Sequence, residues 1–400
     1  MAITRRIMLK LGIPSIAAVG MMQSSLSLGD VTADKIDSTT WRSVLSFGAI
    51  GDGNSDDTAA FNAAYDSKHE YIFIPSGYRF VITSPVGSLT RASSKKWIGD
   101  SASVVVIRDA GGFHVAGMRW GFSGIRFIPD GKSVGCAIKS GTINSNRNSF
   151  IHECIFNGEK SGCSFKVAID LYNAWYSSLR GLFINNSGED DFSKNICSGI
   201  GIRLNFCANT RITECDIGSC DIGISITSTL SPVDLGRPHC CEGITISSNT
   251  IIANKSGIDV REGYFINVNN NVIDIPLKDT ENIIYFAAMC SKLSDNWISV
   301  SRGEVYIGKG ESGSPNYDGS CNIIDSNIIR GNSKSNNNLL RIGDINLLKV
   351  TNNQIQFGKF GIVSIGGSQI SVSNNMFAGQ SSAPYDLKMT KRLIIDKNNE

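Results

Sequence analysis

Three charged residues crowd the segment 257–263, which reads Gly-Ile-Asp-Val-Arg-Glu-Gly and contains Asp259, Arg261 and Glu262. Its alternation of apolar and polar residues predicts a strand that turns Asp259 and Arg261 away from a core, with Glu262 at the turn that follows. A glycosidase needs one protonated and one ionised carboxyl group. Asp259 with Glu262, or Asp259 with Asp234, could supply that pair of catalytic groups.

A second chemistry fits the same neighbourhood. A lyase that acts on a uronic-acid polymer needs a base to take the proton beside the carboxylate and a cation to neutralise that carboxylate. His239, Arg237 and Arg261 could serve in those roles. We expect no cofactor and no bound metal, except a calcium ion if the chain is a lyase. A simpler interpretation is that Asp259 and Arg261 have no catalytic role. Charged residues on a solvated strand commonly pair with their neighbours, and such pairs contribute little to stability.

Four further residues are predicted to bind substrate. The strand 282–286 is read with Phe286 facing outward, beside the charged strand. Lys309, Tyr317 and Asp318 belong to an insertion that follows the next strand along the chain. Aromatic rings and polar side chains of this kind are suited to a sugar polymer.

A repeat must position these residues. The unit apolar-x-x-anchor-x-apolar recurs from residue 122 onward, and each repeat is expected to form one coil of short strands that pairs in parallel with the next. We therefore predict an all-β fold, a single-stranded right-handed parallel β-helix over residues 86–400. The anchors are expected to stack in one structural column, and they are Ile125, Cys154, Leu182, Cys215, Asn249, Asn271, Asn296, Asn327, Asn353, Asn375 and Asn398.

Longer repeats mark insertions, which are the places where a solenoid builds a site. The insertions 228–241 and 309–320 are predicted to leave the rod at the same turn, three coils or about 14 Å apart. Between them we expect a trough wide enough for a sugar chain, with Asp259 exposed on its floor. A third insertion lies between Leu182 and Gly201.

The segment 46–58 reads Ser-Phe-Gly-Ala-Ile-Gly-Asp-Gly-Asn-Ser-Asp-Asp-Thr and is followed by Ala-Ala-Phe, and residues 71–78 read Tyr-Ile-Phe-Ile-Pro-Ser-Gly-Tyr. This stretch resembles the G-D-G-x-x-D-D-T-x-A-F opening and first coil of the pectate-lyase superfamily. The resemblance implies a short N-terminal capping helix within residues 46–85. Asp52, Asp56 and Asp57 are then structural rather than catalytic. The Gly-His-Gly and Arg-Ile-Lys signatures of polygalacturonases are absent, so no catalytic residue is carried over.

The N-terminus has the pattern of a targeting segment. The block Thr-Arg-Arg-Ile-Met-Leu-Lys at residues 4–10 resembles a twin-arginine export signal, and the apolar run 11–22 is too short for a membrane span. We expect an export signal over residues 1–29, a linker over 30–45, and a periplasmic or secreted protein.

The amino-acid composition limits the classes of molecule that the protein is expected to bind. Lys and Arg number 38 against 36 Asp and Glu, a net charge of +2, so no strong field attracts nucleic acid or an anionic membrane. The surface is rich in Ser, Thr, Asn and Gly, which suits sugars. The eleven cysteines form no C-x-x-C pair and are read as small buried side chains, with a disulfide between neighbouring coils left open.

These features favour an exported protein that cleaves or modifies an extracellular or capsular polysaccharide, as a lyase or a glycosidase. It resembles the β-helix proteins of exopolysaccharide systems. A non-catalytic polysaccharide-binding protein and a phage tailspike-type depolymerase are the alternatives. The export signal and the lack of a domain after the last repeat disfavour the tailspike. That last repeat stops at Glu400 in the middle of a coil, which predicts a homo-oligomer or an end-capping partner.

Overall fold

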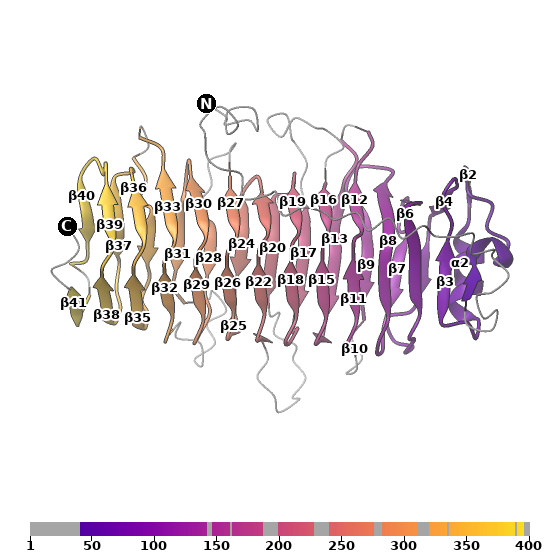
Figure 1. Ribbon diagram of the computed structural model, residues 1–400, viewed down its shortest axis with the longest axis horizontal. Coiled ribbons are helices and arrows are strands. Elements are labelled where there is room, and N and C mark those ends of the chain that lie inside the picture. The colour runs from indigo at the N-terminus through magenta and orange to yellow at the C-terminus, as the bar shows by residue number, and fades with distance from the viewer. Residues whose placement is uncertain are drawn as a thin grey trace, which may run out of the picture.

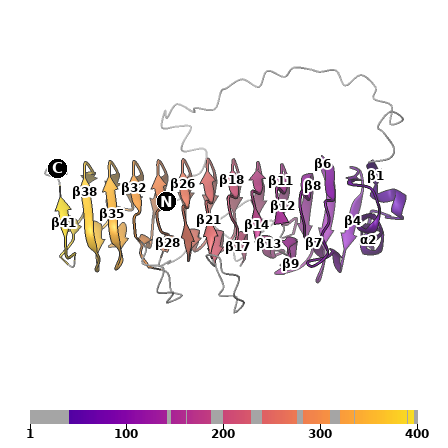
Figure 2. The same ribbon diagram turned by 90° about the horizontal axis from the view of Figure 1, so that it is seen from below.

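The computed structural model describes residues 41–141, 146–160, 162–186, 199–227, 240–275, 282–309, 320–333, 336–388 and 390–395. They form a long rod of stacked coils in which sequence position advances steadily from one end to the other (Figure 1). Strands of successive coils pair in parallel, and the two main sheets run along the rod (Figure 2). The arrangement is all-β and consistent with a right-handed β-helix, as predicted.

The smaller sheet takes one strand from each coil. Within the described ranges it has twelve strands: β5 (Pro85–Gly87), β7 (Gly112–Val115), β9 (Val134–Ser140), β13 (Phe165–Tyr172), β17 (Ile200–Asn205), β20 (Ile222–Thr227), β24 (Ser256–Val260), β28 (Asn282–Phe286), β31 (Glu304–Ile307), β34 (Leu340–Ile342), β37 (Phe360–Ser364) and β40 (Ala383–Asp386).

The larger sheet takes two strands from most coils, joined by a bend. Its described strands are β1 (Trp41–Ser43), β2 (Asp52–Asp56), β3 (Tyr71–Ile74), β4 (Arg79–Ile82), β6 (Lys96–Ile107), β8 (Gly121–Pro129), β11 (Phe150–His152), β12 (Ile155–Asn157), β15 (Ser178–Arg180), β16 (Phe183–Asn185), β18 (Arg211–Thr213), β19 (Asp216–Gly218), β22 (Thr245–Ser247), β23 (Thr250–Ile252), β26 (Asn267–Asn269), β27 (Val272–Asp274), β29 (Lys292–Ser294), β30 (Trp297–Val300), β32 (Ile323–Asp325), β33 (Ile328–Gly331), β35 (Asn346–Thr351), β36 (Gln354–Gln356), β38 (Ser368–Ser373), β39 (Met376–Ala378) and β41 (Leu393–Ile395). Short pairs complete the coils, β10 (Asn146–Arg147) with β14 (Ala174–Trp175) and β21 (Cys241–Glu242) with β25 (Gly263–Tyr264).

The predicted anchors from Cys154 to Asn375 lie at the bend between the two strands of the larger sheet. Ile125 lies instead within the continuous strand β8, and Asn398 is outside the described residues. The Asn296 side chain illustrates the column: the Asn327 Oδ1 accepts from the Asn296 backbone N–H at 3.1 Å and from its Nδ2 at 2.9 Å. The same bonds link Asn249 through to Asn375, one coil at a time. Each buried amide is therefore satisfied by the next, which holds neighbouring coils in register.

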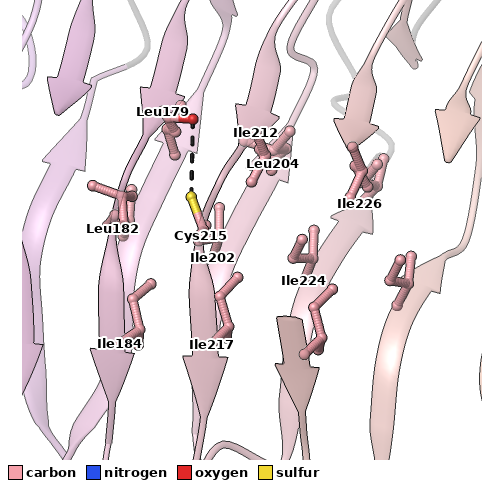
Figure 3. Packing of buried hydrophobic residues seen from close by; sticks show 14 of the residues in the cluster. Leu179, Leu182, Ile184, Ile202, Leu204, Ile212, Cys215, Ile217, Ile224 and Ile226 are labelled. Atoms are coloured by element: carbon pink, nitrogen blue, oxygen red, sulfur yellow. Dashed lines mark hydrogen bonds between the residues drawn. The ribbon is translucent and has the colours of Figure 1, made fainter. Parts of the chain in front are cut away.

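The core is a stack of aliphatic side chains that repeat from coil to coil, such as Ile184, Ile217 and Leu204 (Figure 3). Cys215 occupies one such position, and its thiol lies 4.0 Å from the Leu179 carbonyl. Cys154, Cys207, Cys215, Cys220, Cys240 and Cys241 are all buried, as expected for small apolar side chains. Cys290 and Cys321 are exposed instead, so that prediction was wrong for these two.

A helix lies at the N-terminal end of the rod (Figure 1). It is α2 (Thr58–Asp66), preceded by the 3-10 helix η2 (Val44–Phe47). Phe61 stacks on Trp97 at 5.6 Å between ring centroids, so the helix buries an aromatic ring in the core. The Asp57 carboxylate accepts from the backbone N–H groups of Ile50 at 2.6 Å and Val81 at 3.1 Å, which is the structural role expected of it. No helix in the described ranges combines the length and apolar character that a membrane crossing requires.

Each insertion adjoins a strand of the smaller sheet. The ranges 228–239 and 310–319 follow β20 and β31, two strands of the smaller sheet that are three coils apart. The ranges 187–198 and 276–281 instead come before β17 and β28, and so precede the N-terminal ends of strands of the same sheet. The first two insertions therefore begin on the same side of the rod.

Candidate functional site

One column of side chains runs along the outer face of the smaller sheet. Strand register sets each of these residues beside the corresponding residue of the next coil, so they form a continuous stripe along the rod. The stripe, called the outer column below, consists of Asp170, Arg203, Ser225, Asp259, Tyr285, Tyr306 and Arg341.

The outer column is charged at its N-terminal part. Arg203 and Asp170 form a two-pronged ion pair, with the Arg203 Nε at 2.8 Å and Nη2 at 2.5 Å from the two carboxylate oxygens. Asp259 pairs with Arg261, whose Nε lies 2.7 Å from Oδ1. Arg261 sits two residues after Asp259 on the same face, which explains how one strand supplies both members. The charges of this part of the stripe are thus neutralised locally.

Two tyrosine rings and two guanidinium groups follow as a stacked ladder. The Arg261 guanidinium lies 4.2 Å from the Tyr285 ring centroid, and the Tyr285 and Tyr306 rings are 4.9 Å apart. The Arg341 guanidinium lies 4.7 Å from the Tyr306 ring. Each contact joins neighbouring coils, because the strand spacing matches the spacing of stacked planar groups. We call these four side chains the Arg–Tyr ladder.

The residues around the ladder make room for it. A Cβ atom on Gly308 would lie 2.2 Å from the Tyr306 hydroxyl, and one on Gly343 would lie 2.5 Å from it. Only glycine therefore lets the Tyr306 ring lie along the sheet at these two positions. The Tyr285 hydroxyl donates to the Lys309 carbonyl at 3.0 Å. Both rings are held in one orientation by the fold.

Two further ion pairs border the ladder. Glu304 pairs with Arg341 at the C-terminal end of the ladder. The Lys309 ammonium lies 3.1 Å from the Asp344 carboxylate, and both side chains are largely exposed. Lys309 was predicted to bind substrate, and the structure brings it beside Tyr285.

Glu262 is a buried carboxyl group that directly follows Arg261 in the sequence. Its residue is 3% exposed, and its Oε1 has no hydrogen-bond partner among the described residues. Burial raises the pKa of Glu262 above its ordinary value because the charged form loses its hydration. Asp259, three residues earlier, is instead engaged with a guanidinium group, so the two neighbouring carboxyl groups have opposite environments.

Two sequence-based expectations are wrong here. Asp259 is 5% exposed rather than open to solvent, because the Arg261 side chain lies against it and neighbouring strands flank it. Phe286 is fully buried and faces the core, so it cannot contact a substrate. The outward residue of that strand is Tyr285, which is opposite Asp259 and Tyr306 of the neighbouring strands and is 7% exposed.

The remaining predicted site residues are Asp234, Arg237, His239, Tyr317 and Asp318, and all five lie outside the described residues. The described residues that precede their two segments, Thr227 and Lys309, lie close to the site. Thr227 is opposite Arg261, because Ile226 pairs with Val260 and the Arg261 N–H donates to the Ile226 carbonyl at 2.9 Å. The roles assigned to these five residues therefore remain predictions.

The sequence analysis missed Tyr285, Tyr306, Glu304 and Arg341. A signal for three of them exists: Ile-Asp-Val, Ile-Tyr-Phe, Val-Tyr-Ile and Leu-Arg-Ile are successive apolar-x-apolar strand centres, and the middle residue always faces outward. Within the described residues, no group of three or more His, Cys, Asp or Glu is placed to hold a metal ion.

A stacked parallel β-helix with a charged and aromatic stripe along one sheet defines a solenoid protein of the pectate-lyase-like class. Comparison with protein families makes the assignment specific: the model for "Rhamnogalacturonase A/epimerase, pectate lyase-like" matches residues 41–282, more than half of the 400 residues. The chain belongs to that family. No curated protein matches it in sequence.

Solved structures of several functions share the fold. The catalytic unit of a GH87 α-1,3-glucanase from Streptomyces thermodiastaticus has a TM-score of 0.58 and 15% identity, over 90% of this chain and 68% of that chain. The surface adhesin PfbA of Streptococcus pneumoniae has a TM-score of 0.56 and 15% identity, over 87% and 93%. The A-module of the Azotobacter vinelandii mannuronan C-5 epimerase AlgE4 has a TM-score of 0.54 and 14% identity, over 89% and 94%. At such identities the likeness extends to the fold alone.

Proposed function

We propose that this protein is an exported, carbohydrate-active enzyme that cleaves or modifies an acidic extracellular polysaccharide on the outer face of the smaller sheet. The observation that carries the proposal is the Arg–Tyr ladder, whose first member, Arg261, is followed in the sequence by Glu262. Arg261, Tyr306 and Arg341 are half-exposed, and arginine offers planar donors that match a carboxylate. The glucanase and epimerase of the same fold support an action on polysaccharide.

The carboxyl environments favour proton transfer by Glu262. A general acid must be protonated at the working pH, and burial raises the pKa of Glu262 in that direction. Asp259 is paired with Arg261, and a neighbouring cation favours the charged form of a carboxyl group. One protonated and one ionised carboxyl group is the requirement of a glycosidase. A lyase route through His239 and Arg237 remains the alternative chemistry, with Arg261 as the cation.

The test is an activity screen with matched variants. Acidic and neutral polysaccharides are incubated with the protein, and new reducing ends and the ultraviolet absorbance of unsaturated uronates are followed. We expect reducing ends on an acidic polymer, and a loss of rate of about 100-fold or more in Glu262→Gln. Glu242→Gln is the control, because Glu242 lies one coil earlier and outside the ladder. Unsaturated products would replace the glycosidase assignment with the lyase, and no binding and no product on any polymer would overturn the proposal.

A non-catalytic polysaccharide-binding protein is the second candidate. Asp259 and Glu304 both have arginine partners, an arrangement that suits a binding face as well as a catalytic one. The adhesin of the same fold fits this reading. Binding of an acidic polymer without any product, weakened by Tyr306→Ala, would favour it over the enzyme.

The terminal segments complete the proposal. We assign residues 1–29 to a twin-arginine export signal, which would direct the protein to the periplasm or outside the cell. The linker predicted over residues 30–45 is too long at its C-terminal end, because Trp41–Ser43 form β1, paired with β3, and Val44–Phe47 form η2. Residues 46–85, including α2, would close the N-terminal end of the rod, since Phe61 covers core side chains there.

A further inference from the structure

Cys290 and Cys321 lie next to each other on the surface, one in each of two successive coils. The Cys290 N–H donates to the Ser320 carbonyl at 3.0 Å, and the Ile323 N–H donates to the Ser291 carbonyl at 3.0 Å. In a parallel ladder these two bonds place Cys290 directly opposite Cys321. The next strands continue that register, with Lys292 opposite Ile323.

The local backbone points both side chains the same way. Cys290 and Cys321 have φ angles of 49° and 61°, in the left-handed region, at the same corner of the coil. Both residues are exposed. Equivalent corner positions in the coils before and after carry Phe265 and Leu347, which are also exposed and left-handed. The two sulfur atoms therefore leave the rod side by side into solvent.

We propose that Cys290 and Cys321 are a modification site that closes into an inter-coil disulfide under oxidising conditions. Neighbouring coils are about 4.8 Å apart, and disulfides join Cα atoms about 4.4 to 6.8 Å apart. The corner lies outside the regular strands, so its backbone can adjust more easily than a strand centre. The bond would tie together the two ends of the coil that carries Glu304, Tyr306 and Lys309.

The chemistry balances with a small disulfide such as oxidised glutathione. The thiolate of one cysteine attacks a glutathione sulfur, the glutathione S–S bond breaks, and one reduced glutathione leaves. The second cysteine thiolate then attacks the mixed disulfide, the protein S–S bond forms, and the second reduced glutathione leaves. Two electrons pass from the cysteines to glutathione, and the two thiol protons end on the released glutathione.

A second stacked pair serves as an internal comparison. Cys207 and Cys241 are also in neighbouring coils, and the Cys207 N–H donates to the Cys241 thiol at 3.3 Å. Both are buried, and burial raises the pKa of Cys241, which disfavours the reactive thiolate. Both pairs are stacked in neighbouring coils, but only Cys290 and Cys321 are open to solvent, so only this pair is expected to react with an oxidant.

The experiment uses the purified full chain with oxidised glutathione. We expect the intact mass to fall by two hydrogen atoms, and a peptide joining residues 290 and 321 to appear in a non-reducing digest. Cys290→Ser and Cys321→Ser should each abolish that peptide, while Cys163→Ser, a half-exposed cysteine elsewhere, should leave it unchanged. Amide hydrogen exchange in β29–β31 should slow on oxidation.

Three results would overturn the site: single glutathione adducts without a cross-link, a bond between two molecules only, or full alkylation of both thiols after oxidation. The oxidising setting rests on the proposed export, but the bond itself is tested in vitro. Its failure would thus leave the polysaccharide proposal untouched, and a protein inactive on every polymer could still form the disulfide.

Discussion

At the scale of single residues, the environments of Glu262 and Asp259 separate two carboxyl groups that are three positions apart in the sequence. Glu262 is buried without a partner among the described residues, whereas Asp259 has a guanidinium partner. Burying the Glu262 carboxyl group without a hydrogen-bond partner costs stability, whereas the Arg261 partner offsets part of that cost for Asp259. This contrast makes the pair the first target for mutation.

The raised pKa of Glu262 predicts how stability depends on pH. A carboxyl group whose pKa is higher in the folded state stabilises the fold below its unfolded pKa, near 4.5, and this contribution is lost as the pH rises through the folded pKa. Glu262→Gln should therefore flatten the decline in unfolding free energy above about pH 4.5. Each unit of pKa difference corresponds to about 1.4 kcal/mol.

Urea unfolding at a series of pH values measures that decline. Glu242→Gln should leave the wild-type pH dependence in place. An identical slope in wild type and Glu262→Gln would mean that Glu262 has the same pKa in the folded and unfolded chain.

The Arg–Tyr ladder predicts a second residue-scale effect. Tyr306→Ala removes the ring that Tyr285 and Arg341 both contact, and each such contact contributes about 0.5 to 2 kcal/mol. The free energy of unfolding should fall by a corresponding amount. Calorimetric binding of an acidic polysaccharide should also weaken, because Arg341 loses the ring that orients it, while Tyr306→Phe should retain most of the affinity. Tyr176→Ala, an exposed tyrosine at a corner of the rod, is the control. Equal losses from Tyr176→Ala would place the binding face elsewhere.

At the scale of elements, the asparagine column couples the coils. Asn327 accepts two bonds from Asn296 and donates to the Leu293 carbonyl at 2.9 Å. Asn327→Ala would leave buried polar groups in the coils on both sides without a hydrogen-bond partner, and each such group costs about 1 to 3 kcal/mol. Because a solenoid is held by neighbour contacts, the damage should concentrate in the adjacent coils.

Hydrogen exchange locates that damage. We expect faster exchange in β29, β30, β35 and β36 than in β12 or β16, together with a lower urea midpoint. Asn269→Ala, an outward asparagine on β26, should change neither. Uniformly faster exchange along the whole rod would indicate that the coils unfold as a single unit.

At the scale of the whole molecule, the proposed export predicts where the chain is found. Replacing Arg5 and Arg6 together by lysine should abolish periplasmic accumulation, because the paired arginines are what the twin-arginine system reads. Lys10→Arg keeps the basic character and should export normally. Cell fractionation with an antibody against the rod measures both, and unchanged export of the double-lysine variant would exclude the twin-arginine route.

Much of the molecule could be predicted from the sequence because a solenoid is built from local repeats. The anchors from Cys215 to Asn375 follow from spacing alone, since each buried asparagine bonds to the one a coil away. The structural role of Asp57 followed from its motif. The side of the rod from which the insertions at 228–239 and 310–319 begin followed from counting coils.

The tertiary structure decided which side chains meet across coils. The sequence predicted that Phe286 faces outward, whereas the pairing with the neighbouring strands sets Tyr285 in the outer column and Phe286 in the core. Asp259 is nearly buried for a similar reason: its neighbours come from other coils, and the sequence does not say how closely they cover it. The sequence therefore determined the repeat and the column inside it, through contacts that recur once per coil. The ladder of arginines and tyrosines depends on the exact register between coils, which only the stacked strands define.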